Sequence, residues 1–166
     1  MPVYLGLGSN VGDRMAHLRA AVDALRVEPG VTVLRESQVY ETEPIGETNQ
    51  VFFLNMIVSA ATSLAPEEFL GRMQAIEKRL GRVPTRRWGP RVIDIDIVLW
   101  DGVVVVTEHL TIPHPEFRAR AFVLLPLAEI APDATDPATG ERIEVLAGRV
   151  SGRDGVKLVG ALNVRR

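Results

Sequence analysis

The sequence predicts an α+β fold with a ferredoxin-like βαββαβ core, in which helices pack on a mainly antiparallel sheet. Two observations indicate this class. Short apolar runs alternate with segments whose apolar residues recur at helical spacing, and glycine and proline separate these segments. The resulting order is strand, helix, strand, strand, helix, strand, followed by an extra hairpin strand. Several functions share this fold, so an activity has to be argued from particular residues.

The first half of the core begins with a short apolar strand over Val3 to Leu7, which glycines close. A helix follows, with Asp13 as its N-cap and Pro29-Gly30 as its stop. Its apolar residues recur at helical spacing: Met15, Leu18, Val22 and Leu25. Two strands are then expected, over Val31 to Tyr40 and over Val51 to Ala61.

The second half begins with a helix that has Pro66 in its first turn and Gly81 at its C-terminal end. The apolar stripe of this helix comprises Phe69, Leu70, Met73, Ile76 and Leu80. A strand over Val92 to Trp100 follows, and Asp101-Gly102 turns the chain back into the run Val103 to Val106. This run is the extra hairpin strand of the predicted fold.

The remainder of the chain gives a weaker pattern. Phe122 to Ile130 is predicted to form a short helix, and the tail after Pro132 can be placed only loosely. No internal repeat or linker divides the sequence. Since 166 residues are enough to bury one apolar core, we expect residues 1–166 to form a single domain.

Composition excludes several classes of protein. Hydrophobic residues make up 46% and charged residues 24%, which is typical of globular proteins. The sequence contains no cysteine, which rules out a disulfide framework, a thiol nucleophile and a thiolate metal site. It shows neither a signal-peptide pattern at its start nor an apolar stretch of membrane-spanning length. We therefore expect a cytoplasmic protein that does not bind membranes.

The charge is unevenly distributed along the chain. A net charge of −2 argues against general attraction to nucleic acid. Basic residues nevertheless gather in one short stretch: Lys78, Arg79, Arg82, Arg86, Arg87 and Arg91. Such a segment on a slightly acidic protein favours a small polyanionic ligand, although a solvated charged turn is the alternative. No interface pattern is evident, so we expect a monomer.

The strand predicted over Val92 to Trp100 carries two acidic residues. Successive side chains of a strand point to opposite faces, so Asp94 and Asp96 share one face. The same face should carry Val92, Val98 and Trp100, and the core face Ile93, Ile95, Ile97 and Leu99. Two such carboxylates can hold one or two divalent cations beside a phosphate chain, and hard oxygen ligands favour Mg²⁺. For a D-x-D motif alone, a solvated edge strand is the more common explanation.

The residues before this strand favour the metal site over the solvated edge strand. Arg86, Arg87 and Arg91 offer planar guanidinium groups that bind phosphate oxygens in pairs, and Trp88 offers a flat face for a planar ligand. Carboxylates for a metal and arginines for phosphates are complementary parts of a site for a metal–nucleotide complex. Their combination within about a dozen residues is much more specific than either motif alone.

The segment RWGPRVIDIDIV resembles the signature of the 6-hydroxymethyl-7,8-dihydropterin pyrophosphokinase family of folate biosynthesis. Further segments resemble landmarks of that family in the same order: GLGSNVGD near the start, Tyr40 to Gly46, Phe53 to Asn55, Leu110 to His114, and Arg120 to Phe122. Together they span roughly the first 130 residues, too many to be a chance match of one motif.

The resemblance implies an activity and its cofactors. Members of this family have a ferredoxin-like core and transfer the β,γ-diphosphoryl group of ATP to the hydroxymethyl oxygen of 6-hydroxymethyl-7,8-dihydropterin, releasing AMP. We therefore expect ATP as co-substrate, two Mg²⁺ ions as cofactors and the pterin as acceptor. No nucleic acid is expected as a partner.

The resemblance also implies roles for individual residues. Asp94 and Asp96 match metal ligands, and with Arg82 and Arg91 they form the expected catalytic set. The expected nucleotide-binding residues are Gln74, Glu77, Arg91, Ile97, Thr111, His114 and Arg120. The expected pterin-binding residues are Thr42, Glu43, Ile45, Phe53, Asn55, Trp88 and Phe122. At Glu43 some relatives carry proline, and at His109 some carry arginine.

Two other classes of protein stay open from the residues alone. One is a non-catalytic nucleotide-binding module of ferredoxin-like fold, and the other is a different two-metal nucleotidyl-transfer enzyme. A dinucleotide-binding fingerprint is disfavoured, since Val11 stands where the third glycine of G-x-G-x-x-G belongs. The sequence contains no G-x-x-x-x-G-K-[ST] run, which excludes a P-loop enzyme.

Overall fold

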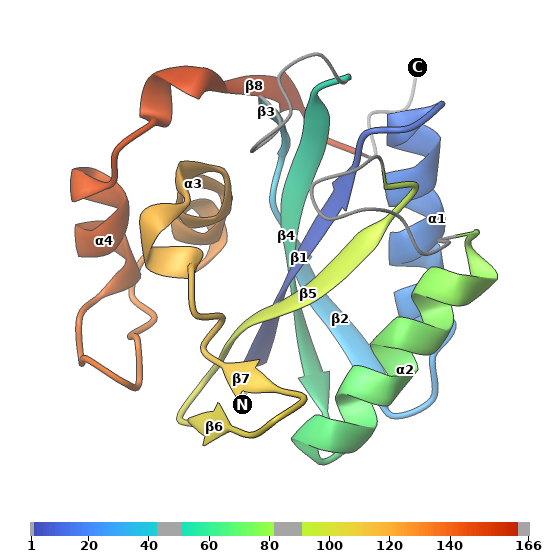
Figure 1. Ribbon diagram of the computed structural model, residues 1–166, viewed down its shortest axis with the longest axis horizontal. Helices are drawn as coiled ribbons and strands as arrows, with labels where there is room; N and C mark the ends of the chain where they lie inside the picture. Colours follow the sequence, from blue (N-terminus) through green and yellow to red (C-terminus); the bar gives the residue numbers. More distant parts are fainter. Residues whose placement is uncertain (1, 43–50, 82–90, 163–166) are drawn as a thin grey trace.

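The computed structural model describes residues 2–42, 51–81 and 91–162, which form a six-stranded sheet covered by helices (Figure 1). The core strands are β1 (Pro2–Ser9), β2 (Val31–Glu36), β3 (Val39–Thr42), β4 (Phe53–Thr62) and β5 (Asp94–Trp100). β1 lies between β4 and β5 and pairs antiparallel with both, while β2 and β3 pair with the other edge of β4. This arrangement confirms the predicted ferredoxin-like α+β fold.

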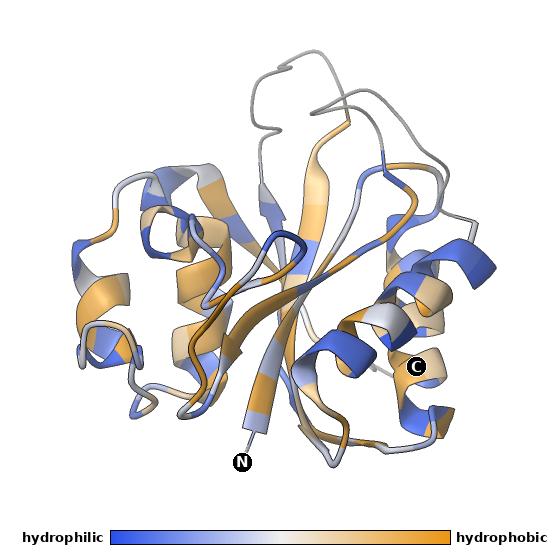
Figure 2. Cartoon of the chain, turned by 60° about the horizontal axis from the view of Figure 1, so that its bottom comes forward, coloured by the Kyte–Doolittle hydropathy of each residue, from blue (hydrophilic) through white to orange (hydrophobic). Residues whose placement is uncertain are grey.

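Helices cover both faces of the sheet. α1 (Arg14–Val27) and α2 (Pro66–Arg79) pack on one face, which we call the α1–α2 face. α3 (Ala121–Ile130) packs on the opposite, α3–α4 face, and α4 (Ile143–Arg149) packs against α3 (Figure 1). Hydrophobic residues of the helices face the sheet on both sides, which produces two buried clusters (Figure 2).

The helix ends follow the local signals in the sequence. The Asp13 carboxylate accepts a hydrogen bond from the Ala16 N–H at 3.1 Å and so caps α1. Pro66 occupies the first turn of α2, where its missing N–H costs no helical hydrogen bond. Gly81 ends α2 with a φ of 98°, a conformation that suits glycine, and its N–H donates to the Lys78 carbonyl.

The strand predicted over Val31 to Tyr40 is wrong as a single element, because it divides into β2 and β3. Ser37 interrupts it: its N–H donates to the Ile57 carbonyl, and its hydroxyl accepts from the Ile57 N–H, both at 2.8 Å. The Gln38 N–H then donates to the carboxylate of Glu129 on α3 at 3.0 Å. These bonds to β4 and to α3 create a break that the local apolar pattern does not show.

A β-bulge alters the last strand of the core, β5. Ile97 and Leu99 pair with consecutive residues of β1, so Val98 is an extra residue on β5. The strand also begins at Asp94 and not, as predicted, at Val92. The two carboxylates of β5 precede the bulge and lie on the α3–α4 face. The side chains that follow the bulge point to the opposite faces from those that regular alternation would give them.

The prediction that Trp100 shares the face of the aspartates is therefore wrong. Trp100 belongs to the α1–α2 face, where its ring meets Phe69 of α2 edge-on with centroids 5.4 Å apart. Leu99, predicted to lie with the isoleucines of β5, is buried on the opposite face in the α3 cluster. Both differences have one cause, since an inserted residue exchanges the faces of every side chain after it.

The segment after β5 departs most from the prediction. The turn at Asp101-Gly102 is present, but β6 (Val105–Val106) pairs with β7 (Thr111–Ile112) in a separate two-stranded sheet and does not extend the core hairpin. The helix predicted over Phe122 to Ile130 is α3, and a short 3-10 helix, η1 (Phe117–Ala119), precedes it.

The tail contributes a strand that the sequence analysis missed. After α4, a 3-10 turn η2 (Arg153–Gly155) leads into β8 (Val156–Gly160), which pairs antiparallel with β3 and becomes the sixth strand of the sheet. None of the helices in the described ranges is long and apolar enough to cross a membrane.

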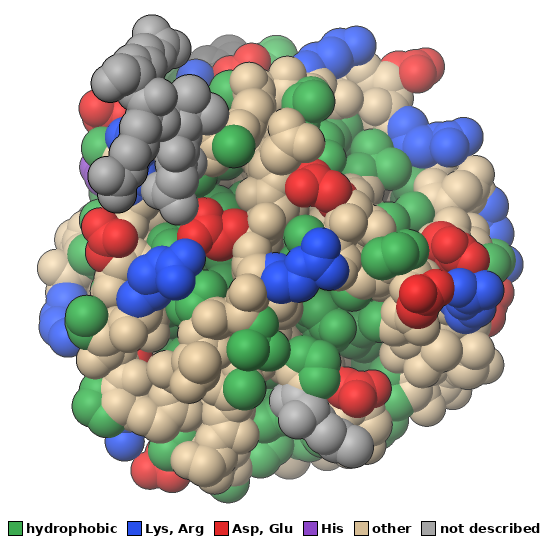
Figure 3. Space-filling model, turned by 180° about the vertical axis from the view of Figure 1, so that it is seen from behind, with side chains coloured by type: hydrophobic (Ala, Val, Ile, Leu, Met, Phe, Trp, Pro, Cys, Tyr) green, Lys and Arg blue, Asp and Glu red, His purple; other side chains and the backbone are tan. Residues whose placement is uncertain are grey.

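Ion pairs connect the elements of the α1–α2 face at its rim. Glu28, at the end of α1, binds Arg72 at 2.8 Å and Arg79 at 3.2 Å, both on α2. On the side of the molecule shown in Figure 3, acidic and basic side chains lie interspersed and form no large patch of one sign. This distribution agrees with the small net charge of the sequence.

Candidate active site

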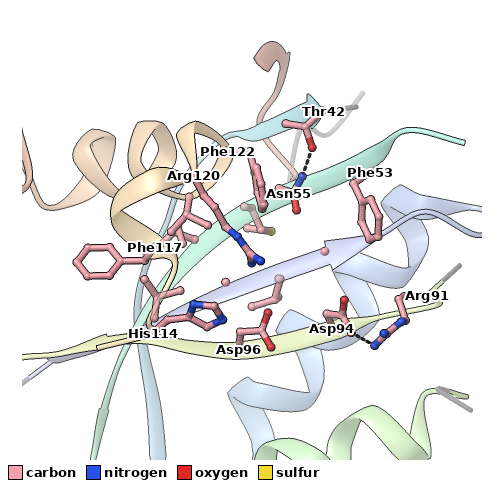
Figure 4. A pocket seen from close by; sticks show the side chains of 17 residues that line it. Thr42, Phe53, Asn55, Arg91, Asp94, Asp96, His114, Phe117, Arg120 and Phe122 are labelled. Carbon is pink, nitrogen blue, oxygen red and sulfur yellow. Dashed lines mark hydrogen bonds and ion pairs between the residues drawn. The ribbon is translucent and has the colours of Figure 1, made fainter. Parts of the chain in front are cut away.

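A pocket opens on the α3–α4 face, between the strands and the segment that leads into α3 (Figure 4); we call it the sheet-face pocket. Its lining includes many residues predicted for the site: Thr42, Phe53, Asn55, Arg91, Asp94, Asp96, His114, Arg120 and Phe122. They come from β3, β4, β5, the start of α3 and the segments that precede β5 and follow β7, so the fold brings together residues that are widely separated in the sequence.

The floor of this pocket is formed by strand residues in register. Asn55 on β4, Gly8 on β1 and Asp94 on β5 face one another in one row. A Cβ atom at Gly8 would lie only 2.9 Å from Asn55 Oδ1, so glycine is required there for this arrangement. The next row consists of Ile57, Gly6 and Asp96. The two glycines leave the space between the amide and the carboxylates open.

Asn55 defines the end of the pocket that can recognise a planar polar ring. It is buried, and its Nδ2 donates to the Thr42 hydroxyl at 2.6 Å, which holds the orientation of the amide. Phe53 and Phe122 lie on either side of Asn55 in Figure 4. Two aromatic side chains beside an oriented amide suit a flat heterocycle with donors and acceptors along its edge.

Asp94 and Asp96 form the acidic end of the pocket. Asp94 is partly buried and pairs with the Arg91 guanidinium at 3.4 Å. Asn10 holds the backbone of Arg91 in place, since its side-chain oxygen accepts from the Arg91 N–H at 2.7 Å. The Arg91 Nε is buried, and no residue in the described part of the chain forms a hydrogen bond with it. An unsatisfied guanidinium N–H beside this pocket fits an anionic ligand such as a phosphate.

His114 lies next to Asp96 in Figure 4. The bulge at Val98 contributes to this placement, because the Val98 carbonyl accepts from the His114 N–H at 2.8 Å. His114 Nδ1 accepts from the Glu116 N–H at 3.1 Å, so a neutral ring carries its proton on Nε2. Burial, and then the positive charge of Arg120, lower the pKa of His114. At neutral pH the ring is therefore an uncharged hydrogen-bond donor.

A second depression, the edge pocket, lies along the outer edge of β5 between α2 and the segment 108–115. Four further predicted residues line it: Gln74, Glu77, Ile97 and Thr111. Glu77 is buried, and its carboxylate accepts from the Ile95 N–H on β5 at 2.7 Å. Asp96 and His114 line both pockets, so the two cavities meet at these side chains.

Four predicted residues lie outside the described ranges, namely Glu43, Ile45, Arg82 and Trp88, together with Arg86 and Arg87. The structure also adds residues that the sequence analysis did not assign to the site: Gly6, Gly8, Asn10, Phe117 and Val123. Alternate glycines within a buried strand were the available signal, because a strand lacking side chains on one face leaves room for a ligand.

Comparisons with known proteins agree on the family. Residues 4–132 match the family described as 7,8-dihydro-6-hydroxymethylpterin-pyrophosphokinase (HPPK). A relative from Methylorubrum extorquens, named 2-amino-4-hydroxy-6-hydroxymethyldihydropteridine pyrophosphokinase, is 48% identical over 85% of this chain and 98% of its own length. A protein of the same name from Bacillus subtilis is 46% identical over 89% of this chain and 88% of its own length.

Solved structures show the same fold at low sequence identity. The Plasmodium falciparum HPPK-DHPS wild type with pteroate superimposes with a TM-score of 0.71 at 16% identity and covers 89% of this chain. The chain spans only 42% of that longer protein, so the likeness concerns the fold of one part of it. The family match over most of the chain, and relatives that are nearly half identical, show that this chain belongs to the 7,8-dihydro-6-hydroxymethylpterin-pyrophosphokinase family.

Proposed function

We propose that this chain transfers the β,γ-diphosphoryl group of ATP to the hydroxymethyl oxygen of 6-hydroxymethyl-7,8-dihydropterin, giving the pterin diphosphate and AMP in folate biosynthesis. The observation that carries the proposal is the meeting of two pockets at Asp96 and His114. A reaction between two substrates needs two adjoining sites whose reactive ends face each other. The proposal includes a monomeric, cytoplasmic enzyme in which residues 1–166 act as one domain.

The pterin is assigned to the sheet-face pocket. Asn55 presents a donor and an acceptor to the ring edge, and Phe53 and Phe122 provide aromatic contacts. Thr42 orients Asn55 from β3. In this pose the hydroxymethyl group points along the floor over Gly8, toward the carboxylates of β5. By the family resemblance, Glu43, Ile45 and Trp88 complete this subsite.

The nucleotide is assigned to the edge pocket. Gln74, Ile97 and Thr111 line it, and Glu77 holds the edge of β5 through its bond to Ile95. The phosphate chain then crosses the junction of the pockets, where His114 donates from Nε2 while Arg91, Arg120 and, by the family resemblance, Arg82 supply positive charge.

The residues present fit Mg²⁺ ions at this junction. Asp94 and Asp96 are adjacent on one face of β5, their Cα atoms about 6.5–7 Å apart by strand geometry. The glycines opposite them leave space for ions. Within the described ranges, no group of three or more acidic or histidine side chains forms a complete metal site, so phosphate and water oxygens would supply the other ligands. When bound, two Mg²⁺ ions neutralise charge on the phosphates.

The chain itself contributes mainly positioning and charge. The hydroxymethyl oxygen releases its proton to solvent and forms a bond to the β-phosphorus, while the bond between that phosphorus and the α–β bridging oxygen breaks, so AMP leaves with the bridging oxygen. The reacting oxygen has to sit in line with β, roughly 3–3.5 Å away, and a ring held by Asn55 would fix it there. Arg91 and His114 stabilise phosphate oxygens as charge moves in the transition state.

Phosphorus NMR of a reaction with ATP, Mg²⁺ and the hydroxymethyl-dihydropterin tests the proposal directly. We expect AMP and a pterin diphosphate, with no turnover when Mg²⁺ is removed by a chelator. ADP with a pterin monophosphate would make the chain an ordinary kinase and contradict the proposal. No ATP consumption with or without Mg²⁺ would favour the non-catalytic binding module.

A further inference from the structure

Arg14 connects three elements behind the pterin end of the sheet-face pocket. It is the first residue of α1, and its Nη1 donates to the carboxylate of Glu41 on β3 and to the carbonyl of Phe52, each at 2.7 Å. The Arg14 side chain is three-quarters buried. Hydrogen bonds from a guanidinium are stronger than those from neutral donors, so these two bonds hold Glu41 and Phe52 more firmly than bonds from a neutral side chain would.

Both partners of Arg14 are chain neighbours of residues that line the pocket. Glu41 precedes Thr42, the hydroxyl that orients Asn55, and Phe52 precedes the Phe53 ring. Thr42 and Phe53 pair with each other as the last residue of β3 and the first of β4. They form the terminal pair of this ladder within the described ranges.

The end of a ladder is less constrained than its middle, because it has a paired neighbour along the strands on one side only. Thr42 is also paired with Val156 of β8, whereas Phe53 lies at the start of β4. Arg14 contacts the chain just beside both members of this terminal pair. Glu41 and Thr42 point to opposite faces of the sheet, since successive side chains alternate. Arg14 therefore acts from the α1–α2 face without entering the pocket, and the pocket does not include it.

We propose that Arg14 is a positioning residue for the pterin subsite, which it orders by holding Thr42 and Phe53 from behind. The inference rests on the function proposed above, because the pterin is assigned to that pocket. Loss of Arg14 should weaken pterin binding and leave nucleotide binding unchanged, since the edge pocket lies on the far side of β5.

The test compares Arg14→Ala with Arg26→Ala as a matched control. Arg26 also lies on α1 and forms an ion pair with the sheet, to Glu36 on β2, but the chain neighbours of Glu36 line neither the sheet-face pocket nor the edge pocket. For Arg14→Ala we expect KM for the pterin to rise about 10-fold, the scale of one lost charge-assisted hydrogen bond, with KM for ATP within about 2-fold of wild type. Arg26→Ala should change neither constant.

A third variant separates the two bonds of Arg14. Glu41→Gln keeps a hydrogen-bond acceptor but removes the charge, so the bond from Arg14 to the Phe52 carbonyl is retained. We expect Glu41→Gln to raise KM for the pterin less than Arg14→Ala does. If Arg14→Ala does not fold, Arg14→Lys replaces it, with the same expected direction and a smaller effect.

Equal increases of both KM values, or an unchanged KM for the pterin in a folded Arg14 variant, would overturn the inference. Failure of the proposed function has a different signature, namely no pterin diphosphate from the wild-type protein in phosphorus NMR. Pterin affinity is also measured by fluorescence titration in the presence of a nonhydrolysable ATP analogue. That titration tests the role of Arg14 without relying on turnover.

Discussion

The two faces of the central sheet are built differently although the same strands form them. On the α1–α2 face, β1 contributes Val3, Leu5 and Leu7, all buried among apolar side chains of the helices. On the other face, β1 contributes Gly6 and Gly8, which form part of the pocket floor. Because strand side chains alternate, β1 can present apolar side chains to the α1–α2 face while the same strand leaves room for the pocket on the α3–α4 face, beside the buried cluster of α3. Stability and activity should therefore respond separately to substitutions on the two faces.

The largest effect is expected for activity at Asp96. Asp96→Ala should cost several kcal/mol of transition-state stabilisation, on the order of 10³-fold or more in rate, as expected for the loss of a metal ligand. Its stability should change little or rise, because two neighbouring carboxylates no longer repel each other. Turnover and thermal unfolding are measured on the same preparation. A variant that unfolds while its folded fraction turns over normally would show that the carboxylate is structural.

A substitution on the opposite face of β1 should have the reverse pattern. Leu5 is fully buried against the helices of the α1–α2 face. Leu5→Ala should destabilise the protein by about 2–5 kcal/mol through lost apolar contacts and a residual cavity. The KM values of the folded fraction should stay near those of wild type. Urea unfolding measures the free energy of unfolding, and steady-state kinetics measures the KM values. A selective loss of pterin affinity would contradict the expectation that the two faces act separately.

A smaller effect is expected in the pterin subsite itself. Phe122→Ala should weaken pterin binding by roughly 1–3 kcal/mol through lost stacking and apolar contact, with ATP affinity nearly unchanged. Leu127→Ala is a suitable control, because Leu127 is buried on the same helix and lines neither pocket. Equal losses of affinity for both ligands in calorimetry would mean that Phe122 supports the fold and not the subsite.

The smallest effect is expected at Asp136, a buried carboxylate in the segment between α3 and α4. Burial raises the pKa of Asp136, but hydrogen bonds from Arg118, the Ala138 N–H and Thr139 outweigh it, so the pKa lies below its ordinary value of 3.8. The ionised carboxylate therefore adds stability above that value, and this stability is lost as the pH falls through the lowered pKa. Asp136→Asn should be less stable at neutral pH and equally active.

Denaturant unfolding at a series of pH values checks this expectation. The free energies of unfolding of wild type and Asp136→Asn should begin to converge as the pH falls below the ordinary pKa of 3.8, and should converge fully only below the lowered pKa, where the folded wild-type carboxylate is protonated as well. A constant difference at every pH would assign the effect of the substitution to packing. A change in either KM would extend the functional site into the α4 side of the molecule.

Local patterns in the sequence determined a large part of this protein. The caps at Asp13 and Gly81, the order of the core elements and the shared face of Asp94 and Asp96 all follow from spacing along short segments. The family resemblance is likewise contained in short segments, and the match over residues 4–132 confirms it. Helical and strand periodicities are properties of a few consecutive residues, so one sequence suffices to read them.

The tertiary structure alone decided how distant segments meet. The bulge at Val98 sends Trp100 to the α1–α2 face and offers a carbonyl to His114, and the break at Ser37 depends on bonds to Ile57. The pairing of β8 with β3, and the placing of Gly8 between Asn55 and Asp94, depend on strand register. Register is set by packing and by hydrogen bonds between strands far apart in the chain, so local apolar periodicity does not predict it.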